Sequence, residues 1–369
     1  MRTFRQTSDE ILLAICEKFL FPGDAKPIKG SGRAPRRKGV AELAEELNKE
    51  WSKRNEEFHL SRQEIYPAMI EARQRGLLTL TPRSHQALQR RICDRFRQDP
   101  DHIRVVATES KQPDHVAVEA AHLMLSLIRQ LAKSGKETVH IGFGAGWNPR
   151  VVAFQLATLL RSAGNVPHLV LHAASSGFAV DQPHTAPVTY FGFFEQTAAP
   201  SIDQVGIFGP PFVPRKDYPA TLEQAGVREA FARRDEIDVM VTSLASAKDE
   251  DGDLRRSMKE DGALEQKADL PKLERQGWVG DVQHLPYSAT EPIEGDLGYR
   301  AVTLFDLKDL AELAGKPDKH VVLVSSPCSV CHRTRADALL PLLSAPQLKV
   351  WTHLVTDIPT ARDVMELAS

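Results

Sequence analysis

Beyond Pro100, short apolar runs alternate with segments of helical periodicity, and this alternation limits the possible folds more than any other feature. The runs have the length of buried strands and lie at 103–107, 138–142, 168–172, 204–208, 238–242, 320–325 and 350–354. Helical segments at 115–133 and 149–161 follow the first two runs. Because parallel strands need a long crossover connection, the pattern predicts a doubly wound, mostly parallel α/β domain with helices on both faces of the sheet.

The residues before this region lack the alternation and contain three helical segments instead. Apolar residues repeat at helical spacing in 8–20 and 40–51, and a third segment, 60–76, ends at a glycine before the strand-like run 77–81. Three helices followed by a strand are typical of a winged helix-turn-helix, whose last helix enters the major groove of DNA. We therefore predict a winged helix-turn-helix domain over residues 1–82.

The third helical segment, LSRQEIYPAMIEARQRG, carries the residues that we expect to meet DNA. Ser61 and Glu64 match the S-x-x-E capping box, which begins a helix. Pro67 lies inside this segment, where it would remove a backbone hydrogen bond. Either the helix is kinked there, or it begins near Tyr66 with Pro67 in its first turn. The outward-facing candidates for DNA contact are Arg62, Gln63, Tyr66 and Arg73.

Charge is divided unevenly along the chain. The formal net charge is −2, but residues 1–98 hold 20 Lys and Arg against 13 Asp and Glu, or +7, and the rest holds 27 against 36, or −9. The segment 26–38 contains no acidic residue, and its Arg36, Arg37 and Lys38 are candidates for contacts with DNA phosphates. This asymmetry favours double-stranded DNA as a partner; RNA, a protein partner and merely solvated helix faces stay open as alternatives.

A glycine-rich loop follows the strand-like run 138–142. Within HIGFGAGWNPRVV, Gly142, Gly144 and Gly146 lead into a helical segment with Asn148 as the expected cap. Backbone amides at such a helix start suit a phosphate or a carboxylate. The spacing matches neither the dinucleotide fingerprint nor a P-loop, and glycines that serve only a tight turn are the alternative.

Two of the four cysteines belong to the pattern Cys328-x-x-Cys331-His332. This pattern occurs in c-type haem attachment and in zinc sites, and two such cysteines can also form a redox-sensitive dithiol. The chain has neither an export signal nor an apolar segment long enough to span a membrane, so we expect a cytoplasmic protein with reduced thiols and no membrane partner. We therefore expect no cofactor and no metal. An ordinary loop is the simplest interpretation, with Cys328, Cys331 and His332 as alternative ligands.

Several motifs stand in the order and approximate spacing found in one protein family. They are the glycine loop, IDVMVTSLA (237–245), GWVGDVQHLPY (277–287), YRAVTLFDLKDLAEL (299–313) and LKVWTHLVTDIPTARDVMELAS (348–369). Together with the third helical segment, they resemble bacterial SorC-type transcriptional regulators. The resemblance implies a DNA-binding regulator rather than an enzyme, a homo-dimer or homo-tetramer, whose operator affinity is changed by a small anionic effector such as a sugar phosphate. It also implies a linker helix and first strand over 83–110 and an effector-binding and oligomerisation domain over 111–369.

The same resemblance assigns an effector pocket, although this chain departs from the family's glycines in several places. The effector-binding positions that it implies are Gly142, Gly144, Gly146, Asn148, Arg150, Ser243 and Asp281, with Arg333 or Arg335 nearest to the family's ligand-contacting lysine. One alternative is an enzyme of the sugar-phosphate isomerase or deaminase type, with Asp281 or Glu291 as its base. Another is a regulator that responds to redox state or metal through Cys328, Cys331 and His332.

Overall fold

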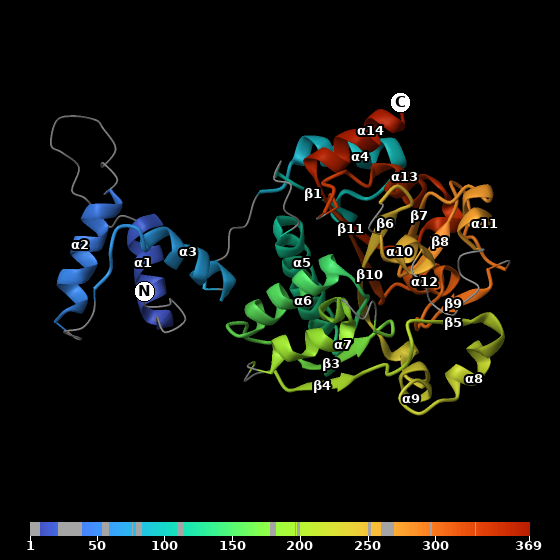
Figure 1. Cartoon of the computed structure of the whole chain (residues 1–369), viewed down its shortest axis with the longest axis horizontal. Helices are drawn as coiled ribbons and strands as arrows, with labels where there is room; N and C mark the ends of the chain where they lie inside the picture. Colours follow the sequence, from blue (N-terminus) through green and yellow to red (C-terminus); the bar gives the residue numbers. More distant parts are fainter. Residues whose placement is uncertain are drawn as a thin grey trace. The chain divides into compact units, whose positions relative to one another are not determined.

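The computed structural model (Figure 1) divides the chain into two compact units, Met1–Leu80 and Thr81–Ser369, each with its own hydrophobic core. The two units are described separately. The structure describes residues 8–20, 39–53, 59–75, 77–78, 83–108, 114–177, 182–195, 197, 200–249, 252–259, 269–295, 297–328 and 330–369.

The smaller unit contains three helices that share one core. They are α1 (Asp9–Leu20), α2 (Val40–Trp51) and α3 (Ile65–Gln74), and α1 contacts both of the others. Apolar residues at helical spacing provide the inward faces, so the three amphipathic stripes meet. The most buried of them are Leu12, Ile15, Leu43, Leu47, Ile65, Ala68 and Ala72.

Polar side chains fix the connection that leads into α3, and others fix the C-terminal end of that helix. The Asn48 side chain donates to the Leu60 carbonyl (2.8 Å) and accepts from the Leu60 amide (2.7 Å), which holds the end of the α2–α3 connection against α2. Arg75 forms ion pairs with Asp9 (3.0 Å) and Glu71 (2.7 Å), so it joins α3 to α1. Arg75 therefore has a structural role.

The structure decides between the two predicted forms of the third helix in favour of the later start. The Ser61 amide donates to the Glu64 carboxylate (2.7 Å), which is one half of the capping box, but α3 begins only at Ile65. Pro67 consequently lies in the first turn, where its missing amide costs nothing, and no kink is needed. Of the predicted strand 77–81, Leu77 and Leu78 form a bend and the rest lies outside the described residues, so the wing stays a prediction.

Parallel strands form the centre of the larger unit (Figure 1). They are β1 (Ile103–Val106), β2 (Thr138–Phe143), β3 (His168–Ala173), β4 (Ile202–Val205), β6 (Val239–Ser246), β10 (His320–Ser325) and β11 (His353–Asp357), in the order β1-β11-β10-β6-β2-β3-β4. Their pairings are parallel throughout. The predicted mostly parallel sheet is thus confirmed, and its near-continuous apolar strands suit a sheet that is buried on both faces.

Helices pack against this sheet between the strands. They are α4 (Gln86–Phe96), α5 (Asp114–Lys133), α6 (Trp147–Leu160), α7 (Pro187–Tyr190), α8 (Tyr218–Leu222), α9 (Arg228–Ala232), α10 (Asp253–Lys259), α11 (Asp269–Arg275), α12 (Leu307–Ala314), α13 (Ala336–Ser344) and α14 (Ile358–Leu367). The first and last of these, α4 and α14, lie side by side although almost the whole unit separates them in sequence (Figure 1).

Short antiparallel strands were not predicted, and some strand bounds differ from expectation. A hairpin of β7 (Gly280–Val282) and β8 (Leu285–Tyr287) extends from β6, and β5 (Phe212–Pro214) pairs with β9 (Tyr299–Ala301).

The predicted strand 350–354 begins only at His353, because Val350 and Trp351 are buried without belonging to the ladder. An apolar run indicates that its residues are buried, whereas strand pairing depends on the register between neighbouring strands.

The chain passes outward in two directions from the centre of this sheet. From β2 it continues to β3 and β4 on one side, and β6, β10 and β11 follow on the other. The adjacent pair β2 and β6 is therefore the topological switch point, where open α/β sheets form a crevice at the carboxyl ends of their strands.

Candidate functional site

A cavity of about 360 Å³ lies at the carboxyl ends of β2, β6 and β10, at the switch point. The loop after β2 contributes Gly146, Trp147 and Asn148, the end of β6 contributes Ser243 to Ala245, and the segment after β10 contributes Pro327 and Cys328. Loops that leave neighbouring parallel strands thus converge on one space. The β7–β8 hairpin closes it from a further side.

The glycine loop is held in place by its own backbone. Gly146 has φ +116°, which only glycine adopts without strain, and its amide donates to the Thr185 carbonyl (3.0 Å). The Gly144 amide donates to the Val241 carbonyl (2.9 Å), and the Tyr190 hydroxyl donates to the Gly146 carbonyl (2.9 Å). Two of the loop's amides therefore serve the fold rather than a ligand.

The prediction that Asn148 caps the helix is wrong. The cap position belongs to Gly146, and α6 begins at Trp147, so Asn148 lies in the first turn with its side chain buried. Its carboxamide oxygen accepts from the Ser326 hydroxyl (3.0 Å), which fixes the side chain at the cavity wall. Because the first helical turn leaves its amides without carbonyl partners in the helix, those of Trp147 and Asn148 can donate to an anion.

Three of the predicted effector residues in the glycine loop and its helix, Gly142, Gly144 and Arg150, are absent from the described cavity wall. A Cβ on Gly142 would lie 2.6 Å from the Met240 sulfur, and one on Gly144 would lie 3.1 Å from the Thr242 hydroxyl, so both glycines permit close strand packing. The Arg150 guanidinium lies over the rings of Trp147 (5.3 Å) and Phe193 (5.4 Å). These residues position the loop and do not line the space.

The charged side chains on the cavity wall are Asp253, Arg256, Asp281 and Arg335, and both arginines are paired with carboxylates. Arg335 bonds to the buried Asp249 behind the wall (Nε to Oδ2, 2.8 Å), and Arg256 bonds to Asp253 (2.8 Å). Of the two candidate arginines, only Arg335 is on the described wall, since Arg333 borders a separate hollow with Asp337.

Asp281 is the buried carboxyl of the cavity. Burial, assisted by the charge of Asp253 and opposed by that of Arg335, raises its pKa to about 8. Neighbouring His284 has its pKa lowered by burial to about 3, so it is neutral at pH 7. Asp281 is mostly protonated at that pH and can donate a hydrogen bond. Glu291, the other base considered, is exposed and is not among the described wall residues.

Sequence reasoning missed Gln283, which lies at the tip of the β7–β8 hairpin. Gln283 (φ +52°) and His284 (φ +63°) form its two-residue turn, where Asn or Gly is usual. The amide oxygen and nitrogen of Gln283 are both buried and have no hydrogen-bond partner among the described residues. A strained backbone and unpaired polar atoms on a cavity wall are typical of a ligand-binding position. The letters VQHL contain no turn signal that could have revealed it.

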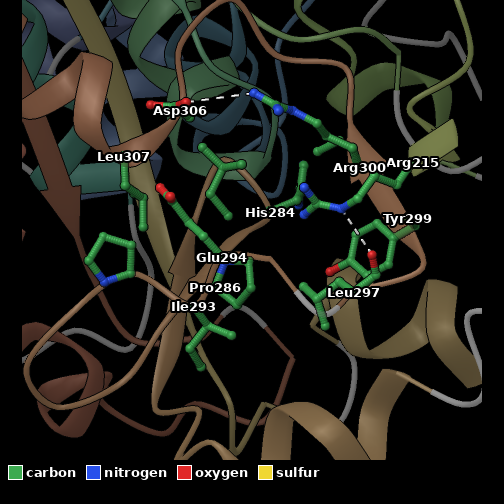
Figure 2. A pocket seen from close by; sticks show the side chains of 13 residues that line it. Arg215, His284, Pro286, Ile293, Glu294, Leu297, Tyr299, Arg300, Asp306 and Leu307 are labelled. Carbon is green, nitrogen blue, oxygen red and sulfur yellow. Dashed lines mark hydrogen bonds and ion pairs between the residues drawn. The ribbon is translucent and has the colours of Figure 1, made fainter. Parts of the chain in front are cut away.

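A second, smaller cavity of about 90 Å³ lies on the other side of the same hairpin (Figure 2). Figure 2 shows an apolar wall that includes Pro286, Ile293 and Leu297, with the Arg215 side chain bonded to the Leu297 carbonyl (3.1 Å). His284 belongs to the walls of both cavities. The hairpin tip is therefore a thin partition between them.

No protein-family model and no curated protein sequence matches the chain. It shares its fold with SorC-type transcriptional regulators. The full-length sorbitol operon regulator SorC from Klebsiella pneumoniae superposes with a TM-score of 0.60 at 12% identity, over 98% of this chain and 100% of that one.

Further solved structures give the same result for part of the chain. A DeoR family transcriptional regulator from Listeria monocytogenes has a TM-score of 0.56 at 13% identity, over 75% of this chain and 98% of its own. A domain of a possible sugar-binding transcriptional regulator from Arthrobacter aurescens has a TM-score of 0.54 at 17% identity, over 79% of this chain and 100% of its own. The resemblance predicted from the motifs is thus confirmed for the fold.

The predicted DNA-contacting residues lie together on one face of the smaller unit. Arg62 and Gln63 are exposed in the turn before α3 rather than on the helix, and Tyr66 and Arg73 are exposed on α3 itself. Ile70, which the sequence reasoning did not select, is 58% exposed between them. The predicted contacts Arg36, Arg37 and Lys38 lie outside the described residues.

The cysteine loop borders the large cavity through one of its members. Cys328 is buried and lines the cavity, and Cys331 is exposed. His332 (φ +58°) borders the separate hollow instead. Among the described residues, no helix is both long and apolar enough to cross a membrane.

Proposed function

We propose that this chain is a DNA-binding transcriptional regulator, acting in the cytoplasm, whose affinity for its operator is changed by a small anionic metabolite of the sugar-phosphate class. The observation that carries the proposal is the cavity at the β2–β6 switch point in a fold shared with SorC-type regulators. The Arthrobacter protein is described as sugar-binding, and we extend that property to this chain.

The lining of the cavity supports a hydroxylated ligand with one anionic group. Asn148, Ser243 and Gln283 offer neutral donors and acceptors for sugar hydroxyls. The first-turn amides of α6 lie at one end of the wall and suit a phosphate. The arginines on the wall are already paired with carboxylates, so a ligand of high negative charge is disfavoured.

The exposed face of α3 supports duplex DNA as the partner. Arg62 and Gln63 can reach base edges from the turn that precedes the helix, where Arg pairs with guanine and Gln with adenine. Tyr66 and Ile70 add exposed apolar surface beside them. We further propose a homo-dimer or homo-tetramer, in which bound effector changes the arrangement of protomers and thereby the spacing of their DNA-binding faces.

The experiment that tests this function is the selection of genomic DNA fragments by the full-length protein, at two salt concentrations and with a panel of phosphorylated sugars. We expect one palindromic site to be enriched and its binding to be weakened by salt and altered by one compound. The double variant Arg62→Ala/Gln63→Ala should lose this enrichment, and Arg91→Ala, which removes an exposed arginine of the larger unit, should keep it. Equal binding by both variants would refute the assignment of the α3 face.

A second candidate function rests on Asp281. A carboxyl with a pKa near neutrality inside a cavity can move protons, so an isomerase-type activity on a sugar phosphate is the alternative. Turnover of the compound found in the DNA screen, lost in Asp281→Asn, would establish it. Binding of the compound without turnover supports the regulator.

A further inference from the structure

We propose that Asp249, Cys328 and Cys331 bind one zinc ion at the edge of the large cavity. None of the three ligands is a predicted effector contact, and the site does not depend on DNA binding. It replaces the Cys-x-x-Cys-His pattern of the sequence with a different third ligand. Asp249 lies 79 positions before Cys328 in the chain, so only the fold brings them together.

The donor atoms already converge. The two sulfur atoms and one carboxylate oxygen of Asp249 lie within 4.8 Å of one another. Tetrahedral zinc with bonds of about 2.3 Å to sulfur needs ligand atoms roughly 3.8 Å apart. The three side chains therefore have to approach by about 1 Å at most, which rotation about the Cys331 side chain can supply because that residue is exposed.

Two backbone hydrogen bonds tie Cys328 to the residues that follow Cys331. The Cys328 amide donates to the Arg333 carbonyl (2.9 Å), and the His332 amide donates to the Cys328 carbonyl (2.9 Å). His332 has φ +58°, and this turn carries its ring to the separate hollow instead of toward the sulfur atoms. The fold thus keeps both thiols at the proposed site and places the histidine of the Cys-x-x-Cys-His pattern away from it.

Charge balance favours a divalent ion at this place. Without metal, Asp249 is paired with the Arg335 guanidinium (2.8 Å). When zinc binds, two thiol protons pass to solvent, and the charges of two thiolates, one carboxylate, Zn²⁺ and Arg335 add up to zero. A neutral cluster avoids the large cost of an unbalanced buried charge.

Three protein ligands leave one position of tetrahedral zinc for water or a ligand. Cys328 and Arg335 both line the large cavity, so a hydroxyl or carboxylate oxygen of a molecule in it is the natural fourth donor. A zinc ion here would give the cavity a cation beyond its paired arginines.

Metal titration of the full-length protein tests the proposal. The protein is stripped with a chelator, kept under a thiol-free phosphine reductant so that no disulfide forms, and titrated with Co²⁺ alone and then with Zn²⁺ in competition. We expect one ion per chain and thiolate-to-cobalt charge-transfer absorption that zinc abolishes. Neither DNA nor effector is present, so the outcome is independent of the proposed regulatory function.

Variants identify the ligands. Cys331→Ser removes an exposed thiol without touching the core, and it should weaken zinc affinity at least 10- to 100-fold, as should Asp249→Asn. His332→Ala and Cys93→Ser are matched controls that should bind as the parent does. Absence of the charge-transfer band in the parent, or unchanged affinity in Cys331→Ser, would overturn the site. Loss of binding in His332→Ala with retention in Asp249→Asn would show that the sequence pattern, and not the proposed triad, holds the metal.

Discussion

At the scale of single residues, the clearest sign of function is a side chain that weakens the fold. Gln283 occupies left-handed backbone and buries two polar atoms without a partner among the described residues. Each feature costs about 1 kcal/mol or more, and neither is offset by a contact within the protein. A bound molecule that hydrogen-bonds to the carboxamide would offset both.

Gln283→Gly should therefore leave the protein as stable as before or more stable by up to about 1 kcal/mol, because glycine adopts φ +52° freely. Val282→Gly, one position earlier in extended β7, is the matched control and should cost about 2–4 kcal/mol through lost burial. Urea unfolding measures both. A loss in Gln283→Gly as large as that in the control would contradict the idea that this turn is strained.

Asp281 makes stability depend on pH in an unusual direction. Its pKa is about 8 in the folded protein and about 3.9 in an unfolded chain, so between these values the folded state holds a proton that the unfolded state has released. Stability from this group is thus present below about pH 4 and lost as pH rises toward 8. Asp281→Asn, which cannot ionise, should be more stable than the parent by roughly 5 kcal/mol at pH 8 and by only about 1 kcal/mol at pH 4.5. A difference that is the same at both pH values would mean that the carboxyl does not titrate in this window.

At the scale of elements, apolar periodicity predicted which helices and strands pack together. It did not predict the caps and turns that fix the loops between them. The helices of the smaller unit and the parallel strands were visible because apolar spacing follows burial. The later of the two predicted starts of α3 is the observed one, and of the capping box only the bond from the Ser61 amide to the Glu64 carboxylate forms. The β7–β8 hairpin was missed because its turn lacks the Asn and Gly that such turns favour.

The same limit applies to the glycine loop. Its presence and location at a strand end followed from the sequence, but Gly142, Gly144 and Arg150 were assigned to ligand binding when they pack the loop. A sequence cannot distinguish a glycine that makes room for a ligand from one that makes room for Met240. Arg335 and Asp281 were placed correctly at the cavity because the resemblance supplied their neighbours in space.

Tyr190 is the residue through which this loop can be tested as an element. Its hydroxyl is buried against the carbonyls of Gly146 (2.9 Å) and Thr185 (2.5 Å). Tyr190→Phe should cost about 1 kcal/mol and speed amide hydrogen exchange at Gly146. Tyr287→Phe, which loses a comparable bond to the Ala338 carbonyl (2.8 Å), should cost about the same without changing exchange at Gly146. Equal exchange at Gly146 in both variants would show that Tyr190 does not hold the loop.

At the scale of the whole molecule, each of the two units has a hydrophobic core of its own. The one in Met1–Leu80 is built from three helices, and the other surrounds the sheet of Thr81–Ser369. The sequence assigned 83–110 to a linker helix and the first strand of the effector domain, and in the structure α4 and β1 lie in the unit Thr81–Ser369, where β1 pairs with β11. Charge asymmetry had suggested the division without showing where these elements pack.

Two cores should give two unfolding transitions. Calorimetry of the full chain is expected to show both, and a fragment of residues 83–369 should keep the transition of the larger unit within a few degrees. A sugar phosphate that binds the large cavity should raise that transition alone, by mass action on its folded state. A single transition in the full chain that the fragment fails to reproduce would show that the units fold as one.

The pairing of β1 with β11 also sets an order of events during synthesis. Ile103 lies beside Leu354, so the strand that leads out of the smaller unit finds its partner only when the ribosome has nearly finished the chain. The three-helix unit is complete some 270 residues earlier, and its connection to the sheet stays unanchored for the whole of that interval. A prematurely terminated or clipped product would thus carry an intact three-helix unit and an incomplete sheet. Under the proposed function, such a fragment would bind DNA without responding to an effector.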